Sequence, residues 1–294
     1  MKPEKIAFIV DSSFSTSEEY LKKNHMYKVF FGITDSDGND YLDDGKMITT
    51  KFIIDKLSEG QFFKTNAVVP GSVMVLLESL YEVYDKVICF AVSSGLSSYY
   101  NNILFLLNEP EYKDKLFIVD TKEVAYSAYD LIDTSRKMLD NGESIEKVIE
   151  YAKNYHLKSY SMFTCETWAA LSKSGRVPKL LSTIFDKVGT RPLILFYEKN
   201  RLGGISRSFE GLVSKMISEY KRIFNYTGPK EIEHVVFYNN FLDEKKAQYI
   251  KDKIAQEFSM PINKIIETMS PNIVIVYTAK GSFGITIKSK NARK

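Results

Sequence analysis

Two serines and a glycine stand at a junction of the sequence where they could bind an anion. The apolar run 86–92 ends at Ser93-Ser94-Gly95, and an amphipathic segment follows. The first turn of a helix leaves backbone N–H groups without partners and carries partial positive charge, so a helix that begins here could hold an anion. Ser94 and Ser97 add hydroxyl donors. The alternative is that Ser93 or Ser94 only caps the helix, and spacing alone leaves both interpretations open.

Further polar clusters follow other predicted strands. Asp11 and Asp120 each end an apolar run, as Ser93 does. Ligands of open α/β sheets bind beyond the carboxyl ends of the strands, so these clusters are candidates for one site. Asp11 could serve as a nucleophile or a metal ligand. Taken alone, it is better explained as the cap of a strand-end turn.

Two more polar segments lie elsewhere in the chain. Thr65 and Asn66 stand between an aromatic pair and a helix that begins at Pro70, and Arg176 follows a glycine that ends a helix. The alternatives to a binding role are an ordinary loop and a surface arginine. The local sequence leaves these alternatives open.

The common catalytic signatures are absent from the sequence. The nucleophile elbow requires G-x-S-x-G, whereas residues 95–99 read GLSSY, with tyrosine in place of the last glycine. The first strand is followed by DSS and not by the dinucleotide pattern G-x-G-x-x-G, and no P-loop occurs. Two cysteines and three widely separated histidines argue against a zinc site. These absences argue against the common hydrolases, dehydrogenases and kinases, and we predict no metal and no cofactor.

The composition is typical of a cytoplasmic protein with one large or two modest domains. The chain has 294 residues, and its net charge of +3 is too balanced to indicate a nucleic-acid partner. Cys89 and Cys165 lie in apolar stretches and are predicted to be reduced core thiols, which excludes a disulfide framework. The N-terminal apolar run is too short for a signal peptide, and no stretch approaches the roughly 18 apolar residues of a membrane helix. We predict a cytoplasmic location and no transmembrane segment.

The order of the elements predicts an α/β fold with two domains and a ligand cleft between them. In the first half strands alternate with helices, which predicts a mostly parallel sheet with helices on both faces. The second half contains a predicted hairpin and should form a mixed α/β sheet, so we expect domains at 1–157 and 158–294. The predicted strands are 5–10, 25–33, 86–92, 115–120, 159–165, 233–238, 264–269 and 272–277, with a hairpin at 191–209. The predicted helices are 49–60, one that begins at Pro70, 96–108, 123–141, one capped by Ser144, two short ones within 167–189, 210–225 and 243–257.

Taken together, these segments resemble the DegV family of fatty-acid-binding proteins, which includes the lipid-carrying subunit of bacterial fatty acid kinase. IAFIVDSS resembles the family's opening strand and Asp-Ser turn, KTNAVVPGSV its Thr-Ser-Gln-Pro-x-Pro-Gly segment, and VSSGLSSYYNN its Ser-Ser-x-Leu-Ser-Gly-Thr-Tyr segment. IVDTK, LSKSGRV, RPLILFYEKNRLGGISRS and YTAKGSFG follow in the family's order. The resemblance covers nearly the whole chain.

The resemblance implies two α/β domains that bind a long-chain fatty acid. Thr65 and Ser94 would hold the carboxylate, with the backbone of Gly95 and Leu96 nearby. Hydroxyl groups suit this role because a buried carboxylate must accept hydrogen bonds. The implied ligand-binding residues are Thr65, Asn66, Ser93, Ser94, Gly95, Leu96 and Tyr277, and the implied contacts with a partner or a phosphate are Arg176 and Arg207.

Several positions depart from the family's pattern. Asn66 replaces the second residue of Thr-Ser, Ala67 replaces the glutamine, and the family's histidine near the C-terminus falls on Tyr277. Tyrosine can donate one hydrogen bond but cannot become a cation near neutral pH, so the head group would be held differently. Lys280, in the altered glycine-rich segment, could replace the lost charge.

We therefore predict a non-catalytic carrier that binds a long-chain fatty acid and presents its carboxylate to a partner kinase for acyl-phosphate formation. Any contact with a membrane surface would be transient. Two alternatives remain open. One is an enzyme that acts on a small phosphorylated or carboxylated metabolite at the same strand ends through Asp11 and Ser94. The other is a regulatory protein that has lost its ligand.

Overall fold

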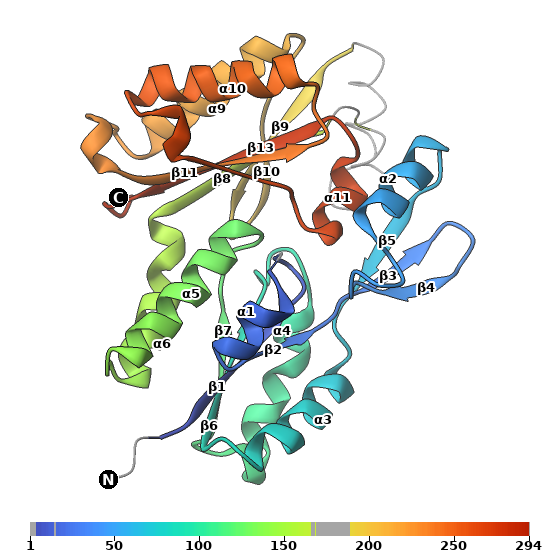
Figure 1. Ribbon diagram of the computed structural model, residues 1–294, viewed down its shortest axis with the longest axis vertical. Coiled ribbons are helices and arrows are strands. Elements are labelled where there is room, and N and C mark those ends of the chain that lie inside the picture. The colour runs from blue at the N-terminus through green and yellow to red at the C-terminus, as the bar shows by residue number, and fades with distance from the viewer. Residues whose placement is uncertain (1–3, 15, 166–167, 169–188, 294) are drawn as a thin grey trace. The chain divides into compact units, whose positions relative to one another are not determined.

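The computed structural model describes residues 4–14, 16–165, 168 and 189–293 (Figure 1). The backbone contacts group the chain into two compact units. Unit 1 comprises Met1–Thr34, Gly38–Ile48 and Thr65–Tyr155, and unit 2 comprises Asp35–Asp37, Thr49–Lys64 and His156–Lys294. The grouping therefore changes near the expected boundary and also assigns an early segment to the second unit. The continuous domains 1–157 and 158–294 stay a prediction.

The main sheet of unit 1 is parallel, as the alternation of strands and helices predicts. Its order is β2-β1-β6-β7. The chain therefore adds β2 on one side of β1 and then crosses to the other side of β1 to add β6 and β7. The register pairs Ile9 with Cys89 and Cys89 with Ile118, which brings the carboxyl ends of β1, β6 and β7 level with one another. The strands are β1 (Ile6–Asp11), β2 (Met26–Val29), β6 (Lys86–Ala91) and β7 (Leu116–Asp120).

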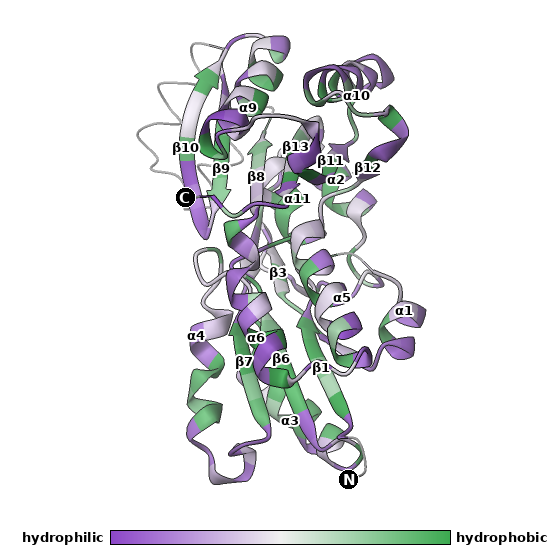
Figure 2. Ribbon diagram, turned by 90° about the vertical axis from the view of Figure 1, so that its left-hand side faces the viewer, coloured by the Kyte–Doolittle hydropathy of each residue, from purple (hydrophilic) through white to green (hydrophobic). Residues whose placement is uncertain are grey.

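Helices contact both faces of this sheet. On one face, Phe8 and Val10 share a hydrophobic cluster with Leu131 of α5 and Val148 of α6. On the other face, the sulfur of Cys89 lies 3.4 Å from the hydroxyl oxygen of Tyr99 on α4. Figure 2 shows β1 and β6 coloured largely hydrophobic, as expected for strands covered on both faces. The helices of unit 1 are α1 (Glu18–Lys23), α3 (Pro70–Tyr81), α4 (Tyr99–Ile103), α5 (Tyr126–Asp140) and α6 (Ile145–Asn154), with 3₁₀ turns η1 (Leu104–Asn108) and η2 (Pro110–Tyr112).

Two predicted elements of the first half differ from the structure. The single strand expected at 25–33 is divided into β2 and β3 (Gly32–Asp35). Strand β3 belongs to a separate sheet of order β4-β3-β5, with β4 (Asp40–Leu42) and β5 (Phe63–Asn66). The helix expected from residue 96 begins at Tyr99 instead, because residues 93–97 form a tight turn first.

Unit 2 is built on the mixed sheet that the second half predicts. Its order is β10-β9-β8-β13-β11-β12, and all pairs are antiparallel except β11 with β12. The predicted hairpin is confirmed as β9 and β10, with Glu198 at a φ of 60° between them. The strands are β8 (Ser159–Thr164), β9 (Arg191–Tyr197), β10 (Lys199–Ser206), β11 (Ile232–Asn240), β12 (Ile265–Thr268) and β13 (Ser282–Ser289).

Two long amphipathic helices supply the core of unit 2. Met216 of α9 and Ile250 of α10 are fully buried in one cluster with Phe237 and Ile285 of the sheet. The helices are α9 (Phe209–Ile223) and α10 (Glu244–Phe258), and short 3₁₀ turns lie at η3 (Tyr155–Leu157), η4 (Pro229–Glu231) and η5 (Ile262–Lys264). Strand β13, in the interior of the sheet, was not predicted from the sequence. The two helices predicted at 167–189 lie almost wholly outside the described residues.

The strand predicted at 272–277 is wrong, because NIVIVY forms most of helix α11 (Asn272–Thr278). Pro271 precedes the helix, and Ile275 is fully buried on it. The helix packs against α2 (Thr50–Ser58), which also belongs to unit 2. The hydroxyl of Thr50 donates to Asn272 Oδ1 at 2.7 Å. Tertiary packing has therefore overridden the strand propensity of the β-branched residues.

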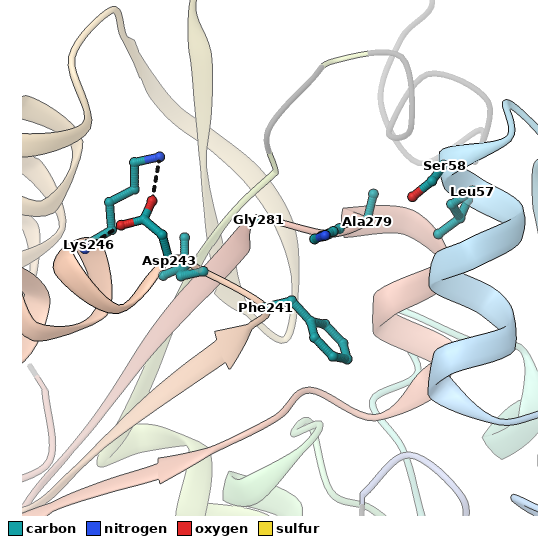
Figure 3. A pocket seen from close by; sticks show the side chains of 9 residues that line it. Leu57, Ser58, Phe241, Asp243, Lys246, Ala279 and Gly281 are labelled. Carbon is teal, nitrogen blue, oxygen red and sulfur yellow. Dashed lines mark hydrogen bonds and ion pairs between the residues drawn. The ribbon is translucent and has the colours of Figure 1, made fainter.

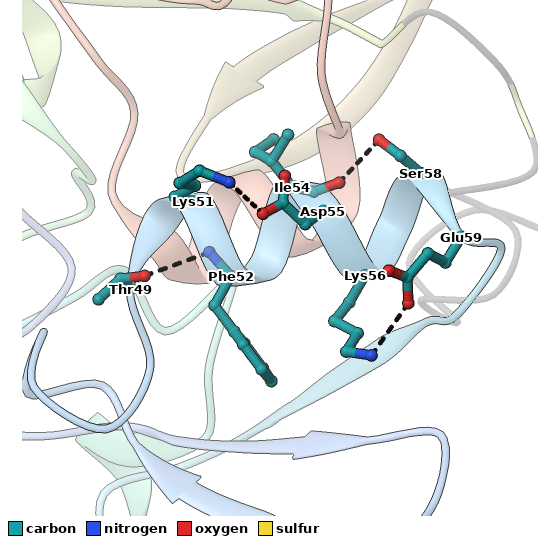
Figure 4. Close-up of polar contacts among 8 residues, drawn as sticks. All are labelled: Thr49, Lys51, Phe52, Ile54, Asp55, Lys56, Ser58 and Glu59. Atoms are coloured by element: carbon teal, nitrogen blue, oxygen red, sulfur yellow. Dashed lines mark hydrogen bonds and ion pairs between the residues drawn. The ribbon is translucent and has the colours of Figure 1, made fainter.

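Helix α2 itself agrees with the prediction for 49–60. Thr49 caps it by accepting the N–H of Phe52 at 3.2 Å, as Figure 4 shows. Lys51 and Asp55 form an ion pair one turn apart on its exposed side. The apolar side of the helix carries the buried Ile53 and Ile54. The amphipathic pattern thus fixes which side of α2 enters the core of unit 2.

Candidate functional site

The carboxyl ends of β1, β6 and β7 bring three of the predicted polar clusters together in unit 1. Asp11 ends β1, Asp120 ends β7, and Ser93 and Ser94 follow β6. Asp11 Oδ2 accepts the N–H of Val92 at 2.7 Å, and Asp120 Oδ1 accepts the N–H of Ser94 at 3.1 Å. The expectation that these clusters meet at one edge of the sheet is confirmed.

Asp11 is an interior carboxylate that organises this edge. Its side chain is 1% exposed, and its second oxygen, Oδ1, accepts the N–H of Ser13 at 2.8 Å. Burial raises the pKa of Asp11 above its ordinary value of 3.8, even though its hydrogen bonds act in the opposite direction. Both oxygens are thus engaged by the turn that follows β1 and by the end of β6. This environment favours a structural role over that of a nucleophile.

Asp120 and Ser94 form the more accessible part of the site. Ser94 is exposed, and its hydroxyl donates to Asp120 Oδ2 at 2.6 Å. Oδ1 of the same carboxylate accepts the backbone N–H of Lys122 at 3.1 Å in addition to that of Ser94. One side chain therefore holds both the loop that follows β6 and the loop that follows β7.

The backbone donors expected to be spare at the helix start have partners within the chain. The N–H of Ser93 donates to Glu123 O at 3.1 Å, that of Gly95 to Ser93 Oγ at 3.2 Å, and that of Leu96 to Ser93 O at 2.9 Å. Helix α4 begins only at Tyr99. The notion of a helix start with free donors is therefore wrong at this position. The loop is already an anion site whose anions are the protein's own carboxylates.

Thr65 and Asn66 lie at the end of β5, in a different sheet from the one that positions Ser94. Asn66 Nδ2 donates to Thr34 Oγ1 on β3 at 2.7 Å. A methyl group added to Gly32 would lie 3.2 Å from Asn66 Cβ, so the glycine permits a close approach of this side chain. Thr65 is half-buried. Their role as ligand-binding residues stays a prediction.

Tyr277 belongs to unit 2, where it is buried on α11. The segment after the helix turns sharply, with Ala279 at a φ of 61° and Gly281 at a φ of 78°. Sequence reasoning missed the residue that anchors this turn, Asn240 at the end of β11. The sequence pattern of β11 does not indicate this role, because the partners of Asn240 lie 30 and 42 residues further along the chain.

Asn240 is 1% exposed and satisfied by hydrogen bonds on all sides. Its amide nitrogen donates to Ser270 Oγ at 3.1 Å and to Ser282 Oγ at 2.9 Å, while its side-chain oxygen accepts the N–H of Ser270 at 2.9 Å. Its backbone carbonyl accepts the N–H of Gly281 at 2.8 Å. This buried network fixes the two chain segments that flank α11.

A hollow of about 420 Å³ lies within unit 2 beside that turn (Figure 3). Leu57 and Ser58 of α2 line it on one side, and Phe241 and Lys246 line it on another. Lys246 forms an ion pair with Asp243 at 3.0 Å. Lys280, the predicted replacement for the family's histidine charge, is exposed and also lines this hollow.

Of the two arginines proposed for partner contact, only Arg207 lies among the described residues. Arg207 is exposed and stands between β10 and the cap of α9 at Ser208. Arg176 lies outside the described residues. Among the residues that the structure describes, no group of His, Cys, Asp and Glu is arranged to hold a metal ion. Within that same part of the chain, no helix is both long and apolar enough to span a membrane.

Comparison with known proteins gives matches along almost the whole chain. The family profile described as "Uncharacterised protein, DegV family" matches residues 5–290. A DegV domain-containing protein of Ureaplasma parvum is 29% identical over 287 residues, which cover 97% of this chain and 96% of that protein.

Solved structures with the same fold carry more informative names. The fatty acid binding DegV family protein of Streptococcus agalactiae is 20% identical, with a TM-score of 0.82 and coverage of 98% of this chain and 100% of that one. The fatty acid kinase (Fak) B3 protein of Streptococcus pneumoniae, loaded with linoleic acid, is 17% identical. Its TM-score is 0.77, and the match covers 97% of this chain and 99% of that one. These likenesses establish the two-domain α/β fold.

Proposed function

The chain belongs to the DegV family, and we propose that it binds a long-chain fatty acid as a non-catalytic carrier. The observation that carries the proposal is the match of fold over nearly the whole chain to proteins named for bound fatty acids. The strand-end site of unit 1 supports it, because the exposed hydroxyl of Ser94 stands beside a rigid carboxylate framework that can orient a polar head group.

The ligand's chain would supply most of the affinity. Each buried CH₂ group contributes about 0.8 kcal/mol, so a long acyl chain needs only one or two polar contacts to fix its orientation. In such a complex Ser94, Thr65 and their neighbours would set the position of the head group. A role of Asp11 as a nucleophile is less consistent with its burial and its two accepted backbone hydrogen bonds.

Bound lipid is tested directly on the purified protein. Denaturing extraction followed by mass spectrometry should release about one fatty acid per chain. Delipidated protein should unfold at a higher temperature with oleic acid, because a ligand at 100 times its Kd adds about 2.7 kcal/mol of stability. Octadecane is the control for the chain without a head group. The proposal fails if no fatty acid is extracted and oleic acid gives no shift.

We further propose that the carrier presents its ligand to a partner kinase, as the name of the Streptococcus pneumoniae relative suggests. Arg207, exposed immediately before the cap of α9, is a candidate for contact with the partner or with phosphate, and Arg176 is a second. A kinase subunit, ATP and this protein should together form acyl phosphate, trapped by hydroxylamine as the hydroxamate.

Omission of either protein should abolish the hydroxamate. Arg207→Ala should lower the rate, whereas Arg201→Ala, which removes an exposed arginine of β10, should not. Product formed by this chain and ATP alone would contradict the carrier role. The cytoplasmic location stays a prediction, consistent with two free and buried cysteines, and transient membrane contact stays one as well.

A further inference from the structure

Ser94 carries the hydroxyl that the proposed function assigns to the ligand's head group, and its one proton is already engaged. Oγ lies 2.6 Å from Asp120 Oδ2, within the range of about 2.5–2.7 Å that is usual for a hydroxyl donating to a carboxylate. Oδ1 of Asp120 accepts from two backbone N–H groups, which can only donate. The carboxylate is therefore the acceptor at both oxygens, and Ser94 is the donor.

This assignment leaves Ser94 with acceptor capacity alone. A hydroxyl has one proton and two lone pairs, so Ser94 can receive a hydrogen bond from a ligand but has none to give. An ionised fatty acid offers only acceptors and carries the same charge as Asp120. A protonated carboxyl group or an alcohol offers the O–H that the free lone pairs of Ser94 require.

The backbone N–H groups of the loop after β6 that lie nearest to Ser94 are already engaged within the protein. The N–H of Val92 is taken by Asp11, and those of Ser93, Gly95 and Leu96 are taken within the loops. The charged and titratable side chains of the surrounding elements include Asp11 on β1, Tyr27 and Lys28 on β2, Lys86 and Cys89 on β6, Tyr99 and Tyr100 on α4, and Lys122 and Glu123 after β7. The ammonium groups of the lysines are hydrogen-bond donors.

We propose that Asp120 fixes Ser94 as a hydrogen-bond acceptor and so makes this site selective for head groups that donate, including the protonated form of a fatty acid. The inference rests on the proposed function and specifies how the same site reads its ligand. Asp120 is a positioning residue, because it acts through Ser94 and does not itself contact the ligand.

The substitution Asp120→Asn should turn Ser94 from a hydrogen-bond acceptor into a donor toward the ligand, without a change in the shape of the side chain at position 120. The two backbone N–H groups need an acceptor, so they hold the amide oxygen at the Oδ1 position. The amide nitrogen then takes the Oδ2 position and donates to Ser94 Oγ. The hydroxyl proton of Ser94 becomes free to donate to a ligand, and an acceptor head group is then favoured.

Three ligands with the same chain distinguish the two polarities: oleic acid, oleyl alcohol and methyl oleate, which has no O–H. With the wild-type protein, the acid and the alcohol should bind, and the ester should bind about tenfold more weakly, as expected for one hydrogen bond. Asp120→Asn should remove that penalty on the ester. Asp85→Asn is the control, because it removes an exposed carboxylate that accepts the backbone N–H of Lys5. This variant should bind all three ligands as the wild type does.

Calorimetry in two buffers of different ionisation enthalpy provides the second readout. A free carboxyl group is ionised at pH 8, so oleic acid bound in its protonated form should take up about one proton. Oleyl alcohol should take up none, and Asp120→Asn should abolish the uptake with the acid. Equal binding of acid and ester by the wild type, or acid binding without proton uptake, would overturn the inference while leaving fatty acid binding intact. Absence of binding by all three ligands would overturn both.

Discussion

At the strand-end site, two carboxylates of the protein itself accept backbone hydrogen bonds that the sequence suggested for an external anion. Asp11 and Asp120 accept the backbone N–H groups of the loop after β6 from opposite sides. The positions of these polar clusters follow from the strand pattern, because parallel strands end at one edge. The direction of each hydrogen bond could not be predicted, because it depends on partners that lie 26 or 81 residues away.

Asp11 gives the residue-scale prediction, because its interior position makes its replacement sensitive to pH. Asp11→Asn places an amide nitrogen against either Val92 N–H or Ser13 N–H, so one buried donor loses its acceptor. At pH 5 the variant should lose about 1–3 kcal/mol of unfolding free energy. Urea unfolding measured at pH 5 and pH 8 checks this.

The sign of the pH dependence follows from the raised pKa of Asp11. The folded state holds the proton more tightly than the unfolded chain, so the stability contributed by Asp11 falls as the pH rises from 3.8 through the raised value. Asn does not titrate. The deficit of Asp11→Asn relative to wild type should therefore shrink at pH 8, and a deficit that grows would show that burial does not dominate at this carboxylate.

At the scale of elements, the sequence predicted most strands and helices but misassigned α11. Residues 7–10 of KIAFIV are buried in a parallel sheet, and their composition and their environment agree. NIVIVY has a similar composition, yet it packs as a helix against α2, a segment more than 200 residues earlier. Local pattern cannot contain that contact, which explains why Tyr277 was predicted on a strand although it lies on a helix.

The end of α11 gives the element-scale prediction. Ala279 has φ 61° and ψ −177°, a region that only glycine adopts without a cost of about 1–3 kcal/mol. Ala279→Gly relieves that strain and loses about 0.5–1 kcal/mol through the greater freedom of the unfolded chain. The net effect should be a gain of about 1 kcal/mol in the free energy of unfolding, measured with urea.

A matched substitution separates strain relief from a general effect of glycine. Ala255 lies in the interior of α10, where glycine should cost about 1 kcal/mol relative to alanine. The two variants should therefore differ in sign. If both destabilise the protein, the backbone at Ala279 is not strained, and the turn anchored by Asn240 tolerates a side chain there.

At the scale of the whole molecule, each compact unit is built from segments that are not continuous in the sequence. Each unit has its own hydrophobic cluster, one around Phe8 and Leu131 and the other around Met216 and Phe237. Residues Thr49–Lys64, which carry α2, precede most of unit 1 in the sequence but belong to unit 2. A single boundary near 157 cannot express this arrangement, because sequence position alone does not reveal which core an early amphipathic helix joins.

Full-length Ile53→Ala tests whether α2 belongs energetically to unit 2. Ile53 is fully buried on α2, and its truncation should cost about 2–4 kcal/mol in the unit whose core it fills. Because α2 packs against α11, hydrogen exchange should accelerate at the amides of α11. The amides of α5 in unit 1 should keep their wild-type rates. Acceleration at α5 with α11 unchanged would instead place α2 with the N-terminal core and support two continuous domains.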